Sequence, residues 1–175
     1  MVYYGGVGGY HSRGSILVDK EKKALLWITS LLDRLEIPFQ ITGGLAAIAY
    51  GSKRKLYDID IDIPDDCFEK LKSEIHPYLI WGPDRFEDEH MSLLLLAAKF
   101  DDQLIDISGG CNFKLFNKNT NQWEAYPTDF SSPEMKVLYG RRLPVLPLDK
   151  LIFYKTAISR EVDILDIEQI LHLPR

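Results

Sequence analysis

Cysteine is scarce in this chain of 175 residues, which carries only Cys67 and Cys111. Two cysteines at this spacing form neither a disulfide framework nor a cysteine-rich zinc site. No run approaches the roughly 20 apolar residues that cross a membrane, and the N-terminus lacks the basic-then-apolar order of a signal peptide. These absences predict a cytoplasmic protein with two reduced thiols.

The chain also lacks an excess of positive charge. Its 21 lysine and arginine residues are outnumbered by 26 acidic residues, which gives a net charge of −5. This balance excludes a general duplex-DNA binder, although an anionic nucleotide can bind where positive charge is concentrated locally or a metal ion supplies it. Hydrophobic residues make up 46% of the sequence, enough to bury the core of one globular domain.

Glycine is concentrated at the start of the sequence. Residues 1–15, MVYYGGVGGYHSRGS, hold five of the twelve glycines and show no apolar periodicity. Their spacing fits neither a dinucleotide-binding loop nor a Walker loop, so we predict a flexible leader. Residues 16–175 are predicted to form a single domain with a helical tail from about residue 147.

Apolar periodicity predicts an α/β (α+β) fold, with a small mixed β-sheet flanked by helices and a C-terminal helical segment. Helical spacing predicts a helix that begins at Asp19 and ends at Pro38. Alternation of apolar and acidic residues predicts a strand over Leu56–Ile63. A hairpin is predicted with strands Leu93–Phe100 and Leu104–Ser108. Shorter strands are predicted at residues 39–42, 113–116, 123–126 and 135–139. Further helices are predicted at residues 45–50, from residue 64, and from residue 148 almost to the end.

Acidic and apolar residues alternate strictly in the segment Asp58-Ile59-Asp60-Ile61-Asp62-Ile63. On a strand, the three aspartates lie on one face, about 7 Å apart from one to the next. They repel one another unless they are solvated or bridged by a cation. Mg²⁺ is the natural bridge because it selects carboxylate oxygens and leaves positions for phosphate. The alternative is an amphipathic edge strand whose acids face water.

Two neighbouring motifs favour the cation. Gly43-Gly44 lies between a predicted strand and a helix, where the bare backbone can approach a phosphate, although a tight turn also needs glycine. Asp106 lies inside a predicted strand, Leu104-Ile105-Asp106-Ile107, where aspartate is rare. Together with Asp58 and Asp60, it completes a cage of three carboxylates for two metal ions, the arrangement that serves phosphoryl or nucleotidyl transfer.

The run Ile41-Thr42-Gly43-Gly44, then Asp58-Ile59-Asp60-Ile61 after thirteen residues, and later Ile105-Asp106-Ile107, resembles the nucleotidyltransferases of the DNA polymerase beta superfamily. Within it, the chain looks most like the small antibiotic-type members, such as the lincosamide and aminoglycoside nucleotidyltransferases, and the related abortive-infection and toxin-type enzymes. The resemblance implies that Gly43 and Gly44 form the nucleotide-phosphate turn. It makes Asp58, Asp60 and Asp106 the metal ligands and catalytic acids, with Asp106 as the general base on the acceptor.

Asp62 is ambiguous in this comparison. Its expected role is a supporting one, just beyond the metal-binding pair. The register can also shift by two residues, which makes Asp60 and Asp62 the pair.

Two basic segments are candidates for binding the triphosphate. Ser52-Lys53-Arg54-Lys55 is either a solvated loop or the source of one phosphate ligand, Arg54 or Lys53. Further on, Lys155, Arg160, Asp163 and Asp166 are similar to the tail of the same nucleotidyltransferases, where the lysine can touch the nucleotide phosphates. The alternative is the wet face of an amphipathic helix, stabilised by weak ion pairs.

The predicted activity is Mg²⁺-dependent transfer of a nucleoside monophosphate from an NTP to a hydroxyl, with release of pyrophosphate. The acceptor is a small molecule, a tRNA end or a protein. One alternative is a non-catalytic relative that binds nucleotide or a partner protein, as an antitoxin-like component does. Another is a metal-dependent phosphoesterase with the same cage. The segment Glu87-Asp88-Glu89 is either a solvated loop or a flank of the acceptor pocket.

Overall fold

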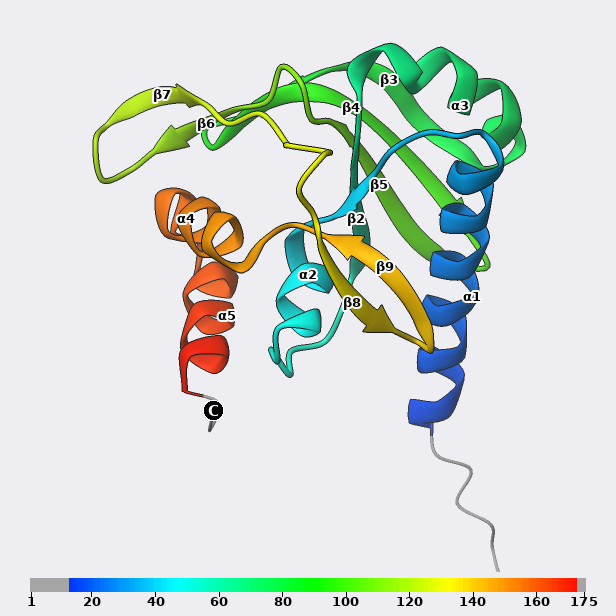
Figure 1. The fold of residues 1–175 in the computed structure, drawn as a ribbon, viewed down its shortest axis with the longest axis horizontal. Coiled ribbons are helices and arrows are strands. Elements are labelled where there is room, and N and C mark those ends of the chain that lie inside the picture. The colour runs from blue at the N-terminus through cyan, green and yellow to red at the C-terminus, as the bar shows by residue number, and fades with distance from the viewer. Residues whose placement is uncertain (1–12, 173–175) are drawn as a thin grey trace, which may run out of the picture.

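The computed structural model describes residues 13–172, so residues 1–12 of the predicted leader lie outside the described part. Within that range, nine strands form one mixed sheet with helices around it, and the predicted α/β class is confirmed (Figure 1). The sheet order is β7-β6-β4-β5-β2-β1-β9-β8, and β3 pairs with β4. The strands are β1 Gln40–Ile41, β2 Asp58–Ile63, β3 Leu79–Glu87, β4 Met91–Phe100, β5 Gln103–Gly109, β6 Lys114–Asn117, β7 Gln122–Ala125, β8 Glu134–Leu138 and β9 Arg141–Val145.

Helices lie at both sides of the sheet in Figure 1, with α1 at one side and the α4–α5 pair at the other. Two short 3-10 turns, η1 and η2, flank α3. Among residues 13–172, no helix has the length and apolar character that crossing a membrane requires. The bounds are α1 Arg13–Arg34, α2 Gly43–Ala49, η1 Asp65–Cys67, α3 Phe68–Ile75, η2 His76–Tyr78, α4 Leu148–Ile158 and α5 Glu161–Leu171.

The isoleucines of β2 fix which way its aspartates point. Ile59, Ile61 and Ile63 are fully buried and join the same hydrophobic core as the apolar face of α1. Because side chains alternate along a strand, Asp58, Asp60 and Asp62 take the opposite face. The core side therefore holds the strand in one register, since a slip of one residue would bury the acids in the core and expose the isoleucines.

The structure corrects several predicted elements. Helix α1 begins at Arg13, so Asp19 lies inside it and does not cap it. Strands β3 and β9 were not predicted. The predicted continuous C-terminal helix is wrong, because the chain forms two helices separated at Ser159, whose φ of 53° is left-handed. Strands β2, β4 and β5 and helices α2 and α3 agree with their predictions to within a few residues.

Candidate active site

Three carboxylates meet where β2 and β5 lie side by side. The two strands are parallel, with Asp60 opposite Asp106 in the register. Asp58, Asp60 and Asp106 each offer an oxygen atom, and these atoms all lie within 4.8 Å of one another. The expectation that Asp106 faces the Asp58/Asp60 pair is therefore confirmed. Three hard oxygen donors at this separation fit a divalent cation such as Mg²⁺.

Two acids of this cluster, Asp60 and Asp106, have raised pKa values. Burial and the charge of Asp58 raise the pKa of Asp60 to about 7, although the hydrogen bond from the Gly44 N–H opposes the shift. Burial and the same Asp58 charge raise the pKa of Asp106 to about 6. A bound cation would lower both pKa values again, because it favours the ionised carboxylates and offsets their repulsion.

The two glycines at the start of α2 lie against the functional side chains. Gly43 has a φ of 56°, and a Cβ on it would overlap the carboxylate of Asp60. A Cβ on Gly44 would overlap the guanidinium of Arg54. The Gly44 N–H donates to Asp60 Oδ2 at 3.1 Å. Glycine is needed at both positions for this close approach, and their role as the nucleotide-phosphate turn stays a prediction.

Asp62 is held apart from the three-acid cluster. It is buried, and its carboxylate accepts hydrogen bonds from Thr128 Oγ1 at 2.5 Å and from Thr42 Oγ1 at 3.4 Å. Burial raises the pKa of Asp62 to about 6, against the effect of the two hydroxyls. The geometry therefore gives no support to the shifted pair of Asp60 and Asp62. Thr128 follows β7 in a loop, and nothing in the sequence marks it as a partner of Asp62.

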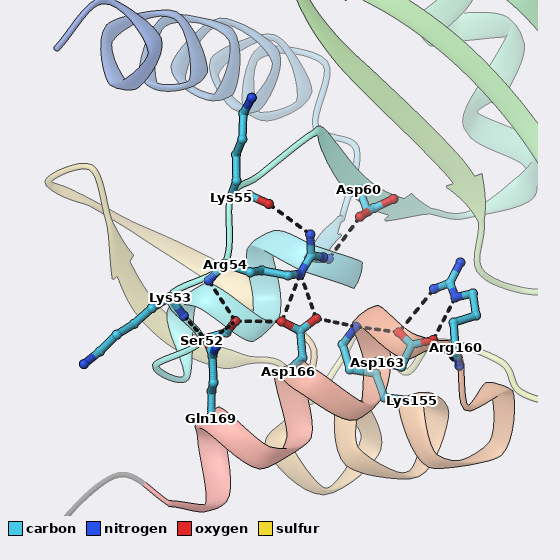
Figure 2. Close-up of polar contacts among 11 residues, drawn as sticks. Ser52, Lys53, Arg54, Lys55, Asp60, Lys155, Arg160, Asp163, Asp166 and Gln169 are labelled. Atoms are coloured by element: carbon cyan, nitrogen blue, oxygen red, sulfur yellow. Dashed lines mark hydrogen bonds and ion pairs between the residues drawn. The ribbon is translucent and has the colours of Figure 1, made fainter. Parts of the chain in front are cut away.

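A network of ion pairs connects the loop after α2 to the two C-terminal helices (Figure 2). Arg54 Nε lies 2.9 Å from Asp166 Oδ1. Lys155 Nζ lies 2.9 Å from both Asp163 Oδ1 and Asp166 Oδ2. Arg160 Nε lies 2.7 Å from Asp163 Oδ2. The wet-face alternative is wrong, because the side chains of Lys155, Asp163 and Asp166 are at most 1% exposed.

Asp163 and Arg160 stay ionised in this network although they are partly or fully buried. Burial alone would raise the pKa of Asp163, but the hydrogen bond from Arg160 and the charge of Lys155 outweigh it and leave the pKa below its usual range. The same hydrogen bond raises the pKa of Arg160 against the effect of burial. The pair of Arg160 and Asp163 therefore stays charged at neutral pH.

Of the two candidate phosphate ligands in the basic loop, Arg54 is the one at the site. Its side chain is largely buried and lines the main cavity. Lys53 is exposed, and Figure 2 shows its side chain pointing away from the carboxylates. Its backbone N–H donates to Gln169 Oε1, which ties the loop to α5.

One cavity of about 400 Å³ brings these groups together. Its polar side holds the three-acid cluster, Gly43 and Gly44, and three cationic side chains, those of Arg54, Lys155 and Arg160. Much of the remaining wall is apolar or aromatic. The apolar wall was not predicted, because β3 was not predicted and the aromatic residues come from separate elements. The apolar and aromatic residues of this wall are Tyr57, Phe86, Met91, Leu93, Leu95, Phe113, Tyr126, Leu146, Tyr154 and Val162.

The fold is that of the nucleotidyltransferases. A protein from Thermotoga maritima assigned as a nucleotidyltransferase has a TM-score of 0.63 and 17% identity, over 87% of this chain and 94% of that one. The lincosamide antibiotic adenylyltransferase LnuA, bound to lincomycin, has a TM-score of 0.59 and 16% identity, over 87% and 97% of the two chains. The solution structure of the antibiotic-resistance factor ANT(2'')-Ia has a TM-score of 0.56 and 20% identity, over 86% and 80%.

The sequence narrows this class to one family. The profile of the aminoglycoside-2''-adenylyltransferase family matches residues 24–170, and the chain belongs to that family. No curated protein sequence gave a significant match. The matched range includes all three clustered carboxylates and the cation network, so both lie within the part of the chain that defines the family. The predicted resemblance to antibiotic-type nucleotidyltransferases is confirmed.

Proposed function

We propose that this protein is a Mg²⁺-dependent nucleotidyltransferase that moves AMP, or another nucleoside monophosphate, from an NTP to a hydroxyl of a small acceptor. The acceptor oxygen forms a bond to the α-phosphorus, the bond from that phosphorus to the pyrophosphate oxygen breaks, and pyrophosphate leaves. The observation that carries this proposal is the convergence of three carboxylate oxygens within 4.8 Å. Adenylyl transfer is the activity named for the family and for LnuA.

Asp58, Asp60 and Asp106 would hold the metal, which supplies charge neutralisation for the phosphates when it is bound. Asp106 accepts the proton of the attacking hydroxyl, the role of a general base placed beside the reacting oxygen. Gly43 and Gly44 present backbone to the triphosphate. Arg54 and Lys155 line the same cavity and would neutralise phosphate oxygens there.

The acceptor is proposed to be a small molecule with an apolar face. A cavity of about 400 Å³ falls within the usual size of small-molecule sites. On the side of β3 and β4, the cavity wall has one acid, Asp88, which already accepts hydrogen bonds from the backbone N–H groups of His90 and Met91. This wall favours an acceptor with few positive charges over a polycationic aminoglycoside.

The test is a transfer assay with Mg²⁺, each NTP in turn, and a panel that includes lincomycin and several aminoglycosides. Mass spectrometry detects an acceptor heavier by one nucleotidyl group, and a coupled assay detects pyrophosphate. The non-catalytic alternative predicts nucleotide binding without either product. The phosphoesterase alternative predicts phosphate or pyrophosphate release that needs no acceptor.

Substitution of Asp106 separates the proposed base from its neighbours. Asp106→Asn is expected to lower kcat by roughly 10²-fold or more and to change the KM for NTP much less, because the base acts on the acceptor. The matched control is Asp102→Asn, an exposed aspartate of the same hairpin that is paired with Lys99. Equal losses in the two variants, or near-full activity of Asp106→Asn, would contradict the assigned role.

A further inference from the structure

Three cationic side chains line the cavity, whereas the two acids that form ion pairs with them lie outside the cavity wall. Arg54, Lys155 and Arg160 belong to the cavity wall, and Asp163 and Asp166 do not. Figure 2 shows the five side chains as one chain of contacts that runs from the loop after α2 to the start of α5. Three cations against two carboxylates leave a net positive charge, which faces the cavity.

Asp166 is the point where this network joins segments far apart in the sequence. Its carboxylate accepts hydrogen bonds from Ser52 Oγ at 2.6 Å and from Arg54 Nε at 2.9 and 3.0 Å. Lys155 Nζ lies 2.9 Å from Asp166 Oδ2. One buried carboxylate thus fixes a cation from the loop and a cation from α4 at the same time.

Asp163 has a local role that Asp166 does not share. Asp163 accepts the backbone N–H of Arg160 at 3.2 Å and completes a capping box at the start of α5. Asp166 lies one turn further along α5, and its hydrogen bonds and ion pairs go to side chains outside that helix. Helix formation therefore explains Asp163 but gives no reason for a buried carboxylate at Asp166.

The contacts of Arg54 leave part of its guanidinium for a ligand. Nε meets Asp166, and Nη1 donates to the Lys55 carbonyl at 3.2 Å. Nη2 lies against Gly44, at the glycine turn beside the three-acid cluster. Held in this way, the guanidinium presents Nη2 at the cavity wall before any nucleotide arrives.

We infer that Asp166 is a positioning residue for nucleotide binding, which holds Arg54 and Lys155 in place so that the triphosphate meets a preformed pair of cations. The inference rests on the proposed function, because it requires an NTP in this cavity. A buried ion pair is rarely retained for stability alone, since apolar side chains of similar volume are often as stable or more stable. Preorganised charge, in contrast, lowers the cost of ordering long cationic side chains at the moment of binding.

The test is a double-mutant cycle on the full chain, with Mg²⁺-ATP affinity measured by titration calorimetry. Arg54→Ala and Asp166→Asn are each expected to weaken ATP binding by about tenfold or more. The double variant is expected to lose clearly less ATP affinity than the sum of the two single losses, because part of the effect of Asp166 passes through Arg54. Lys53→Ala, in the same loop but pointing away, is the control and is expected to bind ATP as the parent does.

Several outcomes would overturn the inference. ATP binding by Asp166→Asn that equals the parent's removes the positioning role, and additive losses in the double variant show that Asp166 acts independently of Arg54. Failure of the parent itself to bind any of the four NTPs with Mg²⁺ refutes the proposed function, a result distinct from any change among the variants. In kinetic assays, the KM for ATP is expected to rise about tenfold with kcat nearly constant, because positioning acts on binding.

Arg54→Lys keeps the test decisive if Asp166→Asn does not fold. Lysine preserves the positive charge but lacks the Nε that Asp166 holds and the Nη2 that lies against Gly44. Arg54→Lys is therefore expected to lose as much ATP affinity as Arg54→Ala. Parent-like affinity in Arg54→Lys would mean that charge alone suffices, which overturns the inference.

Discussion

At the scale of single residues, Asp60 makes the metal-free protein sensitive to pH. Its pKa rises from 3.8 to about 7 in the folded chain, first because of burial and then because of the charge of Asp58. The folded state therefore binds more protons than the unfolded state between about pH 4 and pH 7. The contribution of Asp60 to the free energy of unfolding falls as the pH rises through this window, and the loss is complete above about pH 7.

Asp60→Asn is expected to raise the melting temperature of the metal-free protein at pH 8 by roughly 2–4 °C or more, the shift that 1 kcal/mol produces in a chain of this size. At pH 4 the variant and the parent are expected to melt alike, because the carboxyl is protonated there in the folded state. Thermal melts in EDTA at the two pH values measure the difference. Asp102→Asn, whose exposed carboxyl has its pKa lowered by Lys99, should give no such gain at pH 8. If Asp60→Asn melts below the parent at pH 8, the ionised Asp60 does not destabilise the folded protein and the explanation is wrong.

The residues of the acid cluster were predictable because one simple rule places them. Alternation along a strand put Asp58 and Asp60 on one face, and the one acid inside the predicted strand Leu104–Ser108 supplied Asp106. The partners of Asp62 and Asp166 were not predictable. Thr128 and Ser52 are ordinary loop residues, and only the packing of distant segments brings each against a buried carboxylate.

At the scale of elements, the junction between α4 and α5 carries a local strain. Ser159 ends α4 with a φ of 53°, a left-handed conformation that costs a residue with a Cβ about 1 kcal/mol. The Ser159 hydroxyl donates to the Thr156 carbonyl at 2.5 Å. The turn lets Lys155 on α4 and Asp163 on α5 face each other, which a continuous helix would not allow.

Ser159→Gly is expected to have a free energy of unfolding roughly 0.5–1 kcal/mol above that of Ser159→Ala, because both variants lose the hydroxyl and only glycine adopts this conformation without the steric cost. Ser159→Ala is the matched comparison, since it keeps the steric cost and loses the hydroxyl, and it is expected to be destabilising. Urea unfolding at equilibrium measures both variants. The account of the junction fails if glycine destabilises the protein as much as alanine does.

The same junction shows why some elements escaped prediction. Apolar periodicity continues through residues 148–167 without a glycine or proline, so nothing in the pattern marks a break at Ser159. Strand β3 contains Gly82-Pro83 and is irregular in its pairing with β4. Strand β9 contains Pro144. A proline lowers the expectation of a strand when only the sequence is known. These segments form strands because neighbouring strands in the sheet pair with them.

At the scale of the whole molecule, the acids and the cations of the site come from different parts of the fold. The sheet supplies Asp58, Asp60 and Asp106, whereas α4 supplies Lys155 and the N-cap position of α5 supplies Arg160. A triphosphate that binds both groups connects the C-terminal helices to the sheet. Ligand binding should therefore stabilise the two helices together with the rest of the chain.

Mg²⁺-ATP at a hundredfold excess over its Kd is expected to raise the free energy of unfolding by about 2.7 kcal/mol. Hydrogen exchange should slow in α4 and α5 as well as in β2 and β5. ATP with EDTA is the control, because without the metal the three acids repel the phosphates. Protection confined to the sheet would contradict a nucleotide that reaches both groups.

The ion pair of Arg54 and Asp166 also has a kinetic consequence, since it joins positions 112 residues apart. The β4–β5 hairpin closes across a tight turn at Asp101-Asp102, so the strand of Asp106 pairs with a neighbour that is close in sequence. Closing a long loop costs more entropy than closing a short one, so contacts between distant segments generally form later in folding. The candidate active site is thus expected to assemble in two stages, acids first and cations last, which stopped-flow refolding with separate metal and nucleotide probes resolves. A refolding chain is then expected to bind a divalent ion before it can bind a triphosphate.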